Sequence, residues 1–152
     1  MKKQKRGYGC GLYAVSNALN LDNFITDDRL EKSKRGNVLG QLSKWMQDDG
    51  NPFCIDSLYY NHEGKRLPNS ALHYKPIDNP LLPVLINVQF SDNGKRHLIG
   101  GKIDRENNLY LYDSLKEEPE KTTLSKVNKQ YYRVFGLFIF MSVETGDYVF
   151  IK

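Results

Sequence analysis

The chain has 152 residues, 39% of them hydrophobic and 26% charged, which is ordinary for a soluble globular protein and sufficient for one domain with a buried core. Two cysteines in a chain of this length do not make a disulfide framework. A reducing compartment is therefore the simpler interpretation, and a single disulfide between Cys10 and Cys54 stays an alternative. We expect one domain over residues 1–152, with helices in about 1–50 and a sheet in about 51–152.

The net charge of +4 and the isoelectric point near 9.0 come from lysines and arginines that are scattered through the chain. Their one local cluster lies at the N-terminus and consists of Lys2, Lys3, Lys5 and Arg6. A cluster this short is more typical of a solvated terminus than of a nucleic-acid arm, so we expect no nucleic-acid partner. Its position beside the site described below could favour acidic substrates or partners.

The N-terminal basic cluster is not followed by the apolar run that a signal peptide requires. The longest apolar run, residues 134–143, is broken by Gly136 and Ser142 and is too short to span a membrane. We therefore expect a cytoplasmic protein that does not bind membranes. A virion-associated location and the oligomeric state stay open.

Three helices are predicted in the first third of the chain. The first covers residues 10–20, where apolar side chains recur at helical spacing. The second covers residues 26–31, because Thr26 can cap it and acidic residues fill its first turn. The third covers residues 38–47, whose apolar side chains also share one face.

The rest of the chain is rich in Val, Ile, Phe and Tyr, which is typical of strands. Residues 61–80 are an exception, since their turn residues and prolines indicate a long loop, and residues 116–121 indicate a charged loop. The predicted strands cover residues 53–60, 83–90, 97–103, 109–112, 132–141 and 148–151. Helices followed by an antiparallel sheet predict an α+β domain.

The first predicted helix begins at Cys10, which is flanked by Gly9 and Gly11. A cysteine in the first turn lies among unpaired N–H groups at the positive end of the helix dipole, and both favour the thiolate. The two glycines would let a substrate carbonyl approach the sulfur closely. Six residues earlier, the side-chain amide of Gln4 could donate a hydrogen bond to the oxyanion formed by thiolate attack. The alternative is a cysteine that only packs in a core.

A general base and an orienting acid are predicted from the second half of the chain. His97 opens a predicted strand and Asp113 ends the next one, sixteen residues later. If these strands form a hairpin around residues 104–108, His97 and Asp113 lie at the same end of it. The carboxylate could then fix the tautomer of the imidazole and stabilise its charged form. Taken separately, His97 could be a surface or core histidine and Asp113 a turn residue.

The order Gln4, Cys10, His97, Asp113 resembles that of the papain-like cysteine peptidases. The stretch around Cys10, Gly-Tyr-Gly-Cys-Gly-Leu, is similar to the nucleophile region of double-glycine leader peptidases, which also carry a His and an Asp about sixteen residues apart. The segment from His97 to Leu115 is similar to the His-to-Asp-Ser segment of ubiquitin-like-protein proteases and of the adenovirus protease. In those enzymes the His and Asp precede the Gln and Cys, so this chain would be a permuted relative.

The resemblance implies a papain-like fold and a cysteine peptidase that cleaves peptide or isopeptide bonds through a thioester on Cys10. His97 would be the base, Asp113 its orienter, and Gln4 with the Cys10 backbone N–H the oxyanion donors. It implies a protein or peptide substrate and no cofactor or metal. Two alternatives are an amidase, deamidase or acyltransferase of this fold, and a non-catalytic interaction or structural protein, as a phage or mobile element could encode.

Three further residues can be interpreted without the resemblance. We expect Cys54 to be an inert strand residue, since nothing around it indicates a helix start. His62 and His73 could join Cys54 in a metal site, but their spacings fit no zinc pattern well.

Overall fold

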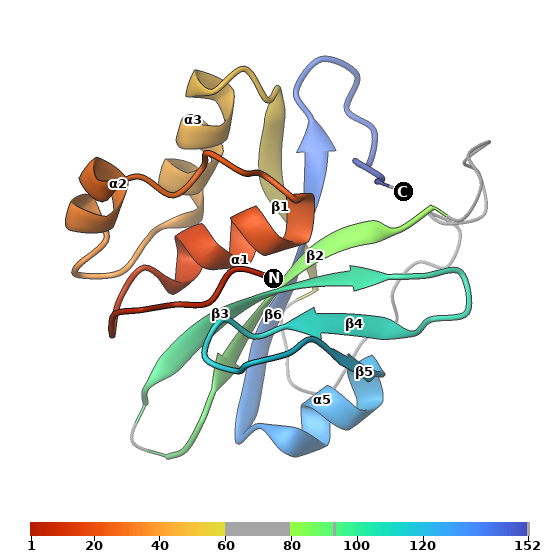
Figure 1. Cartoon of the computed structure of the whole chain (residues 1–152). Helices are drawn as coiled ribbons and strands as arrows, with labels where there is room; N and C mark the ends of the chain where they lie inside the picture. Colours follow the sequence, from red (N-terminus) through yellow and green to blue (C-terminus); the bar gives the residue numbers. More distant parts are fainter. Residues whose placement is uncertain (60–79, 93, 152) are drawn as a thin grey trace.

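A computed structural model describes residues 1–59, 80–92 and 94–151. In this part of the chain the helices are α1 (Cys10–Leu19), α2 (Asp27–Lys32), α3 (Leu39–Asp48) and α5 (Leu124–Gln130). The strands are β1 (Phe53–Tyr59), β2 (Leu82–Gln89), β3 (Arg96–Ile103), β4 (Leu109–Tyr112), β5 (Glu120–Thr122) and β6 (Arg133–Ser142). Along the chain α1, α2 and α3 precede the strands, and α5 lies between β5 and β6. The strands form one antiparallel sheet (Figure 1). The predicted α+β class is confirmed.

The six strands lie in the order β1-β6-β2-β3-β4-β5, and all neighbours are antiparallel. The last strand in sequence, β6, therefore lies inside the sheet, between β1 and β2. The predicted hairpin of the third and fourth strands is confirmed, since β3 pairs with β4 from Ile103–Leu109 to Gly100–Tyr112. This hairpin determines where His97 and Asp113 lie.

The structure corrects three of the sequence predictions. Strand β5 begins inside the predicted charged loop at residues 116–121, and α5 was not predicted. Thr123 caps α5, because its Oγ1 accepts a hydrogen bond from the Lys126 N–H at 3.2 Å. The predicted strand at residues 148–151 is reduced to isolated bridges, Met141 with Tyr148 and Leu81 with Ile151. The predicted loop at residues 61–80 lies outside the described residues except for its last one.

The two faces of the sheet carry separate apolar clusters. Along β2 successive side chains alternate between them: Leu85 packs with α1 and α3, whereas Val84 and Ile86 pack on the opposite face with α5. Figure 1 shows α1, α2 and α3 grouped together and α5 set apart from them, next to β5 and β6. The cluster on the α1 face holds that helix and the sheet in a fixed relation, and the other cluster packs α5 on the opposite face.

Helix α1 approaches β3 unusually closely. A Cβ atom on Gly100 would meet the Ala14 carbonyl oxygen at 2.3 Å, so only glycine fits at this crossing. The close approach brings the first turn of α1 to the beginning of β3, where Arg96 and His97 lie. Gly100 thus allows α1 to pack closely on the sheet and brings Cys10 near the beginning of β3.

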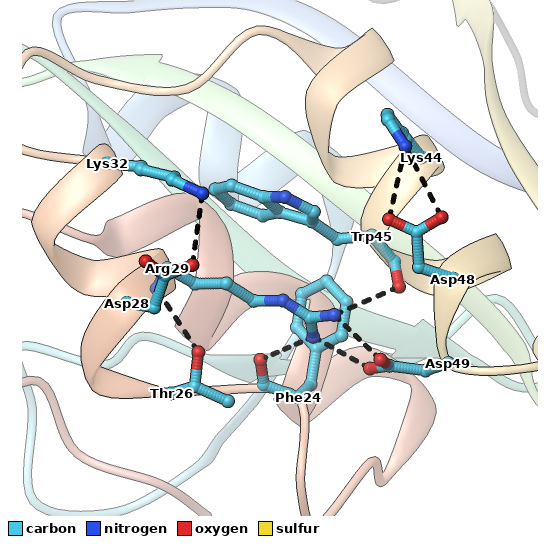
Figure 2. Close-up of polar contacts among 9 residues, drawn as sticks. All are labelled: Phe24, Thr26, Asp28, Arg29, Lys32, Lys44, Trp45, Asp48 and Asp49. Atoms are coloured by element: carbon cyan, nitrogen blue, oxygen red, sulfur yellow. Dashed lines mark hydrogen bonds and ion pairs between the residues drawn. The ribbon is translucent and has the colours of Figure 1, made fainter.

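Helices α2 and α3 are joined by the side chain of Arg29, which we call the Arg29 clasp (Figure 2). Its guanidinium donates two hydrogen bonds of 2.7 Å to the Asp49 carboxylate and further bonds to the carbonyl oxygens of Phe24 and Trp45, at 3.0 and 3.4 Å. It also lies over the Phe24 and Trp45 rings, 5.1 and 5.6 Å from their centres. Asp49 is the C-cap of α3, so the clasp ties the end of α3 to α2.

Candidate active site

Cys10 is the first residue of α1 and its side chain is half-buried. Gly9, the N-cap, has φ 89°, a left-handed conformation that glycine adopts without strain. A Cβ there would also lie 2.8 Å from the Leu30 Cδ2 atom of α2, so a larger residue would also have to displace the end of that side chain. The backbone N–H groups of Gly11 and Leu98 are directed at the sulfur. The thiol therefore lies where the sequence predicted, at the N-terminus of a helix.

His97 and Asp113 meet beyond the last backbone pair of the β3–β4 hairpin, Gly100 with Tyr112. The His97 Nε2 and Asp113 Oδ1 atoms are 2.8 Å apart, and both side chains are only 4% exposed. The Leu115 N–H donates a second hydrogen bond to Oδ1, at 3.0 Å. The carboxylate is thus held on the neighbouring strand end, as the hairpin argument predicted.

The Cys10 thiol and the His97 ring lie close enough to act on each other, since each shifts the pKa of the other toward its charged form. Since Nε2 of the ring is occupied by Asp113, the nitrogen left for the sulfur is Nδ1. The structure thus brings together three of the four predicted residues in the order sulfur, imidazole, carboxylate. These residues are 87 and 16 positions apart in the sequence, and α1, β3 and the end of β4 supply them.

The electrostatics of the three groups act in the same direction. Burial raises the pKa of Cys10, but hydrogen bonds from His97 and from the Leu98 N–H outweigh it and lower the pKa overall. Burial lowers the pKa of His97, but Asp113 and Cys10 raise it to about 9. Burial likewise raises the pKa of Asp113, and the His97 and Leu115 hydrogen bonds bring it below its ordinary value. A lowered thiol pKa and a raised imidazole pKa both favour a thiolate–imidazolium pair.

Gln4 lies beside Asp113 through its neighbour Ser114. The Gln4 N–H donates to the Ser114 carbonyl oxygen at 2.8 Å, and the Ser114 hydroxyl donates to Gln4 Oε1 at 3.0 Å. The Gln4 side-chain Nε2 donates to the carbonyl oxygens of Arg6 and Tyr8, at 2.7 and 3.2 Å. In this arrangement the carboxamide holds the backbone of Arg6 and Tyr8, which lead into Cys10, in place. To bind an oxyanion, Nε2 would have to exchange one of these carbonyls for the substrate oxygen.

Two aromatic residues at the site were not singled out in the sequence. Phe90 stacks on the His97 ring, with ring centres 5.4 Å apart and planes at 25°. Tyr131, which follows α5, donates its hydroxyl to Asp113 Oδ2 at 3.4 Å. The β2–β3 register, in which Val88 faces His97, places Phe90 on the same side of the sheet as the imidazole. A correct register would have predicted Phe90, whereas nothing in the local sequence indicates Tyr131.

The remaining predicted residues lie elsewhere. Cys54 is half-buried in β1, where it pairs with Met141, and both cysteines are free thiols, so the disulfide alternative is wrong for this structure. His62 and His73 lie outside the described residues. Within residues 1–59, 80–92 and 94–151, no three His, Cys, Asp or Glu side chains are grouped so that they could hold a metal ion. The helices of the same residues are all too short or too polar to cross a membrane.

No protein-family model matches the sequence, and no curated protein matches it either. The geometry of Cys10, His97 and Asp113 places a thiol, an imidazole and a carboxylate side by side in that order.

Proposed function

We propose that this chain is a cysteine peptidase of papain-like fold that cleaves peptide or isopeptide bonds. The observation that carries the proposal is the contact of the Cys10 thiol with His97, whose opposite ring nitrogen binds the buried Asp113 carboxylate. A thiol with a lowered pKa, an imidazole with a raised one and an ionised orienter are what acyl transfer by cysteine requires.

In the first half of the proposed reaction the Cys10 thiolate attacks the carbonyl carbon of the scissile bond. The carbon–sulfur bond forms while the carbonyl oxygen takes up negative charge, which the Cys10 backbone N–H and the Gln4 carboxamide would stabilise. The carbon–nitrogen bond then breaks, and the His97 imidazolium gives its proton to the leaving amine. Asp113 keeps the imidazole ring in the orientation that this transfer needs.

In the second half water hydrolyses the thioester. Neutral His97 takes a proton from the water as its oxygen attacks the thioester carbonyl. The carbon–sulfur bond breaks, the carboxylic acid leaves, and the thiolate–imidazolium pair is restored. No redox partner or metal takes part in these steps.

The arrangement of the elements also supports the papain-like assignment. The nucleophile starts a helix, and the helix packs on an antiparallel sheet that provides the histidine and the aspartate from neighbouring strand ends. The cysteine and the histidine come from separate parts of the chain, so their contact depends on the packing of α1 against β3. Exposed Lys5 and Arg6 lie on the approach to Cys10 and would favour acidic residues in a substrate.

The chemistry can be tested without knowing the substrate. After brief treatment with iodoacetamide at pH 6, mass spectrometry should find the label on Cys10 and not on Cys54, because a thiolate reacts and a thiol does not. His97→Ala should slow this labelling. Preferential labelling of Cys54 in the folded protein, or no effect of His97→Ala, would contradict the proposal.

The reaction class requires a second experiment, product analysis after incubation with peptide and isopeptide libraries. New amino termini or freed lysine side chains are expected for a peptidase. Conversion of glutamine to glutamate would instead identify a deamidase, and transfer to an added amine an acyltransferase. A reactive Cys10 that turns over nothing in these libraries would overturn the peptidase assignment.

A further inference from the structure

The Asp113 carboxylate is bound at both of its oxygens. Oδ1 accepts hydrogen bonds from His97 Nε2 and from the Leu115 N–H, at 2.8 and 3.0 Å. Oδ2 accepts one from the Tyr131 hydroxyl at 3.4 Å, in a buried environment. The Asp113 residue is only 3% exposed, so water has little access to complete the hydrogen bonding of Oδ2.

Tyr131 is itself held in place by the fold. It is the C-cap residue of α5, its N–H donates to the Val127 carbonyl oxygen at 3.3 Å, and it is 8% exposed. Its ring packs in the apolar cluster on the α5 face of the sheet. The ring also lies 5.9 Å from Phe90, which stacks on His97. The hydroxyl is therefore directed at Asp113 from a rigid position on a separate element.

We propose that Tyr131 is a positioning residue of the peptidase site, which fixes the plane of the Asp113 carboxylate so that Oδ1 stays on His97. This inference rests on the proposed function. A carboxylate bound at one oxygen can rotate about its Cβ–Cγ bond, and a donor on the second oxygen opposes that rotation. Without the hydroxyl, Oδ2 would be a buried acceptor that receives no hydrogen bond from residues 1–59, 80–92 and 94–151, which disfavours the ionised carboxylate.

The distance limits the size of the effect. An O–H···O bond of 3.4 Å is longer than the usual range of about 2.5–3.0 Å, so it is a weak one of its kind. We expect a loss of about five-fold in rate, which corresponds to about 1 kcal/mol, a typical net value for a single hydrogen bond. Loss of Asp113 itself should have a far larger effect.

The test is the Tyr131→Phe variant, which keeps the ring and removes only the hydroxyl. Its readout is the pH dependence of Cys10 alkylation by iodoacetamide. A less firmly held Asp113 stabilises the His97 imidazolium less, so the thiolate forms at higher pH. The charged and titratable groups that act on Asp113 and Tyr131 are His97, Lys116 and Glu120. Alkylation at pH 6 should slow about five-fold, with the acid limb of the profile moved to higher pH.

Two control variants separate positioning from stability. Tyr132→Phe removes a hydroxyl from the neighbouring tyrosine, whose residue is 52% exposed, and should leave the profile unchanged. Thr123→Ala removes the N-cap of α5 and should lower the melting temperature without moving the acid limb. If Thr123→Ala shifts the limb as much as Tyr131→Phe does, Tyr131 has only a structural role and the inference is wrong.

A double-mutant cycle tests whether Tyr131 acts through Asp113. In an Asp113→Asn background Tyr131→Phe should have no further effect on alkylation. An effect equal to that in the native background would overturn the inference, as would an unchanged profile for Tyr131→Phe alone. His97→Ala distinguishes the two proposals: if it leaves the alkylation profile of Cys10 unchanged, the proposed function itself fails.

Discussion

Two of the carboxylates that bind a cationic side chain, Asp49 and Asp113, can be compared directly, because their partners give them different roles. In the Arg29 clasp, Asp49 receives two bonds of 2.7 Å, and in the candidate site, Asp113 receives one of 2.8 Å from His97. The pKa of each carboxyl group lies below its ordinary value. A perturbed carboxylate alone therefore does not identify a functional site in this protein.

The difference lies in the partner and in the surroundings. A guanidinium keeps its proton at all accessible pH values, so Arg29 can only hold α2 and α3 together. An imidazole can give up its proton, and His97 has a second ring nitrogen for the Cys10 thiol. The clasp is also more exposed, with side chains 12% and 33% accessible, whereas those of His97 and Asp113 are 4% accessible. Because His97 and Asp113 are the more deeply buried pair, the charge of one acts more strongly on the protonation of the other than in the Arg29 clasp.

The largest contrast is expected when each carboxylate is replaced by its amide. Asp113→Asn should lower turnover of a library-identified peptide by about 10³–10⁴-fold, because the amide can neither fix the imidazole tautomer nor stabilise its charge. Asp49→Asn should leave turnover within about two-fold, since the change lies in the clasp. Steady-state kinetics on both variants checks this. Equal losses of turnover would show that the Asp113 pair has no catalytic role that the Asp49 pair lacks.

Gln4→Ala is expected to have the next largest effect, about 100-fold on turnover, as loss of one oxyanion donor does. Alkylation by iodoacetamide forms no oxyanion, so its rate at Cys10 should stay unchanged. A parallel fall in alkylation would show instead that Gln4 acts by bracing the carbonyls of Arg6 and Tyr8. Ser114→Ala is the matched control, because it removes the hydroxyl that binds Gln4 Oε1 and leaves the amide donor in place.

The positions of Cys10, His97 and Asp113 could be predicted from the sequence because the relations that fix them are local or periodic. Cys10 follows from a Gly-flanked helix start, and the meeting of His97 with Asp113 follows from one hairpin. The contact of Cys10 with His97 was inferred from chemistry, and the structure supplies the physical cause, which is the close approach of Ala14 to Gly100. The class of the fold followed from the change of pattern along the chain.

The parts that the sequence did not predict depend on packing between distant elements. Tyr131 reaches Asp113 only because α5 packs on the sheet face next to β6, and α5 itself was missed because it is short and polar. The position of β6 between β1 and β2 is equally non-local. The Gln4 hydrogen bonds depend on the path of residues 4–9, for which turn chemistry gives few rules.

The Arg29 clasp should matter for stability and not for chemistry. Arg29→Met removes the hydrogen bonds to Asp49 and to two carbonyl oxygens but keeps an apolar stem against Trp45. We expect about 2 kcal/mol less unfolding free energy, a value limited by the partial exposure of the pair. Urea titration measures the loss, and turnover under native conditions should stay unchanged. Lys44→Met, which breaks an exposed pair with Asp48, is the control and should cost far less.

The smallest expected effect is a difference in pH dependence between the two pairs. The Arg29 hydrogen bond lowers the pKa of Asp49, so the stability from this pair is present above about pH 4 and is lost as the pH falls through the lowered pKa. His97 has a pKa raised to about 9, so its contribution is complete below about pH 6.5 and is lost as the pH rises through 9. Asp49→Asn should therefore weaken the fall in melting temperature at acid pH. The corresponding change in unfolding free energy should be less than about 1 kcal/mol. Asp113→Asn should weaken the alkaline dependence, through His97, and also the acid dependence, because the pKa of Asp113 is lowered too. Thermal melts of both variants from pH 3 to 10 check the assignment, which is wrong if Asp49→Asn alters the alkaline side.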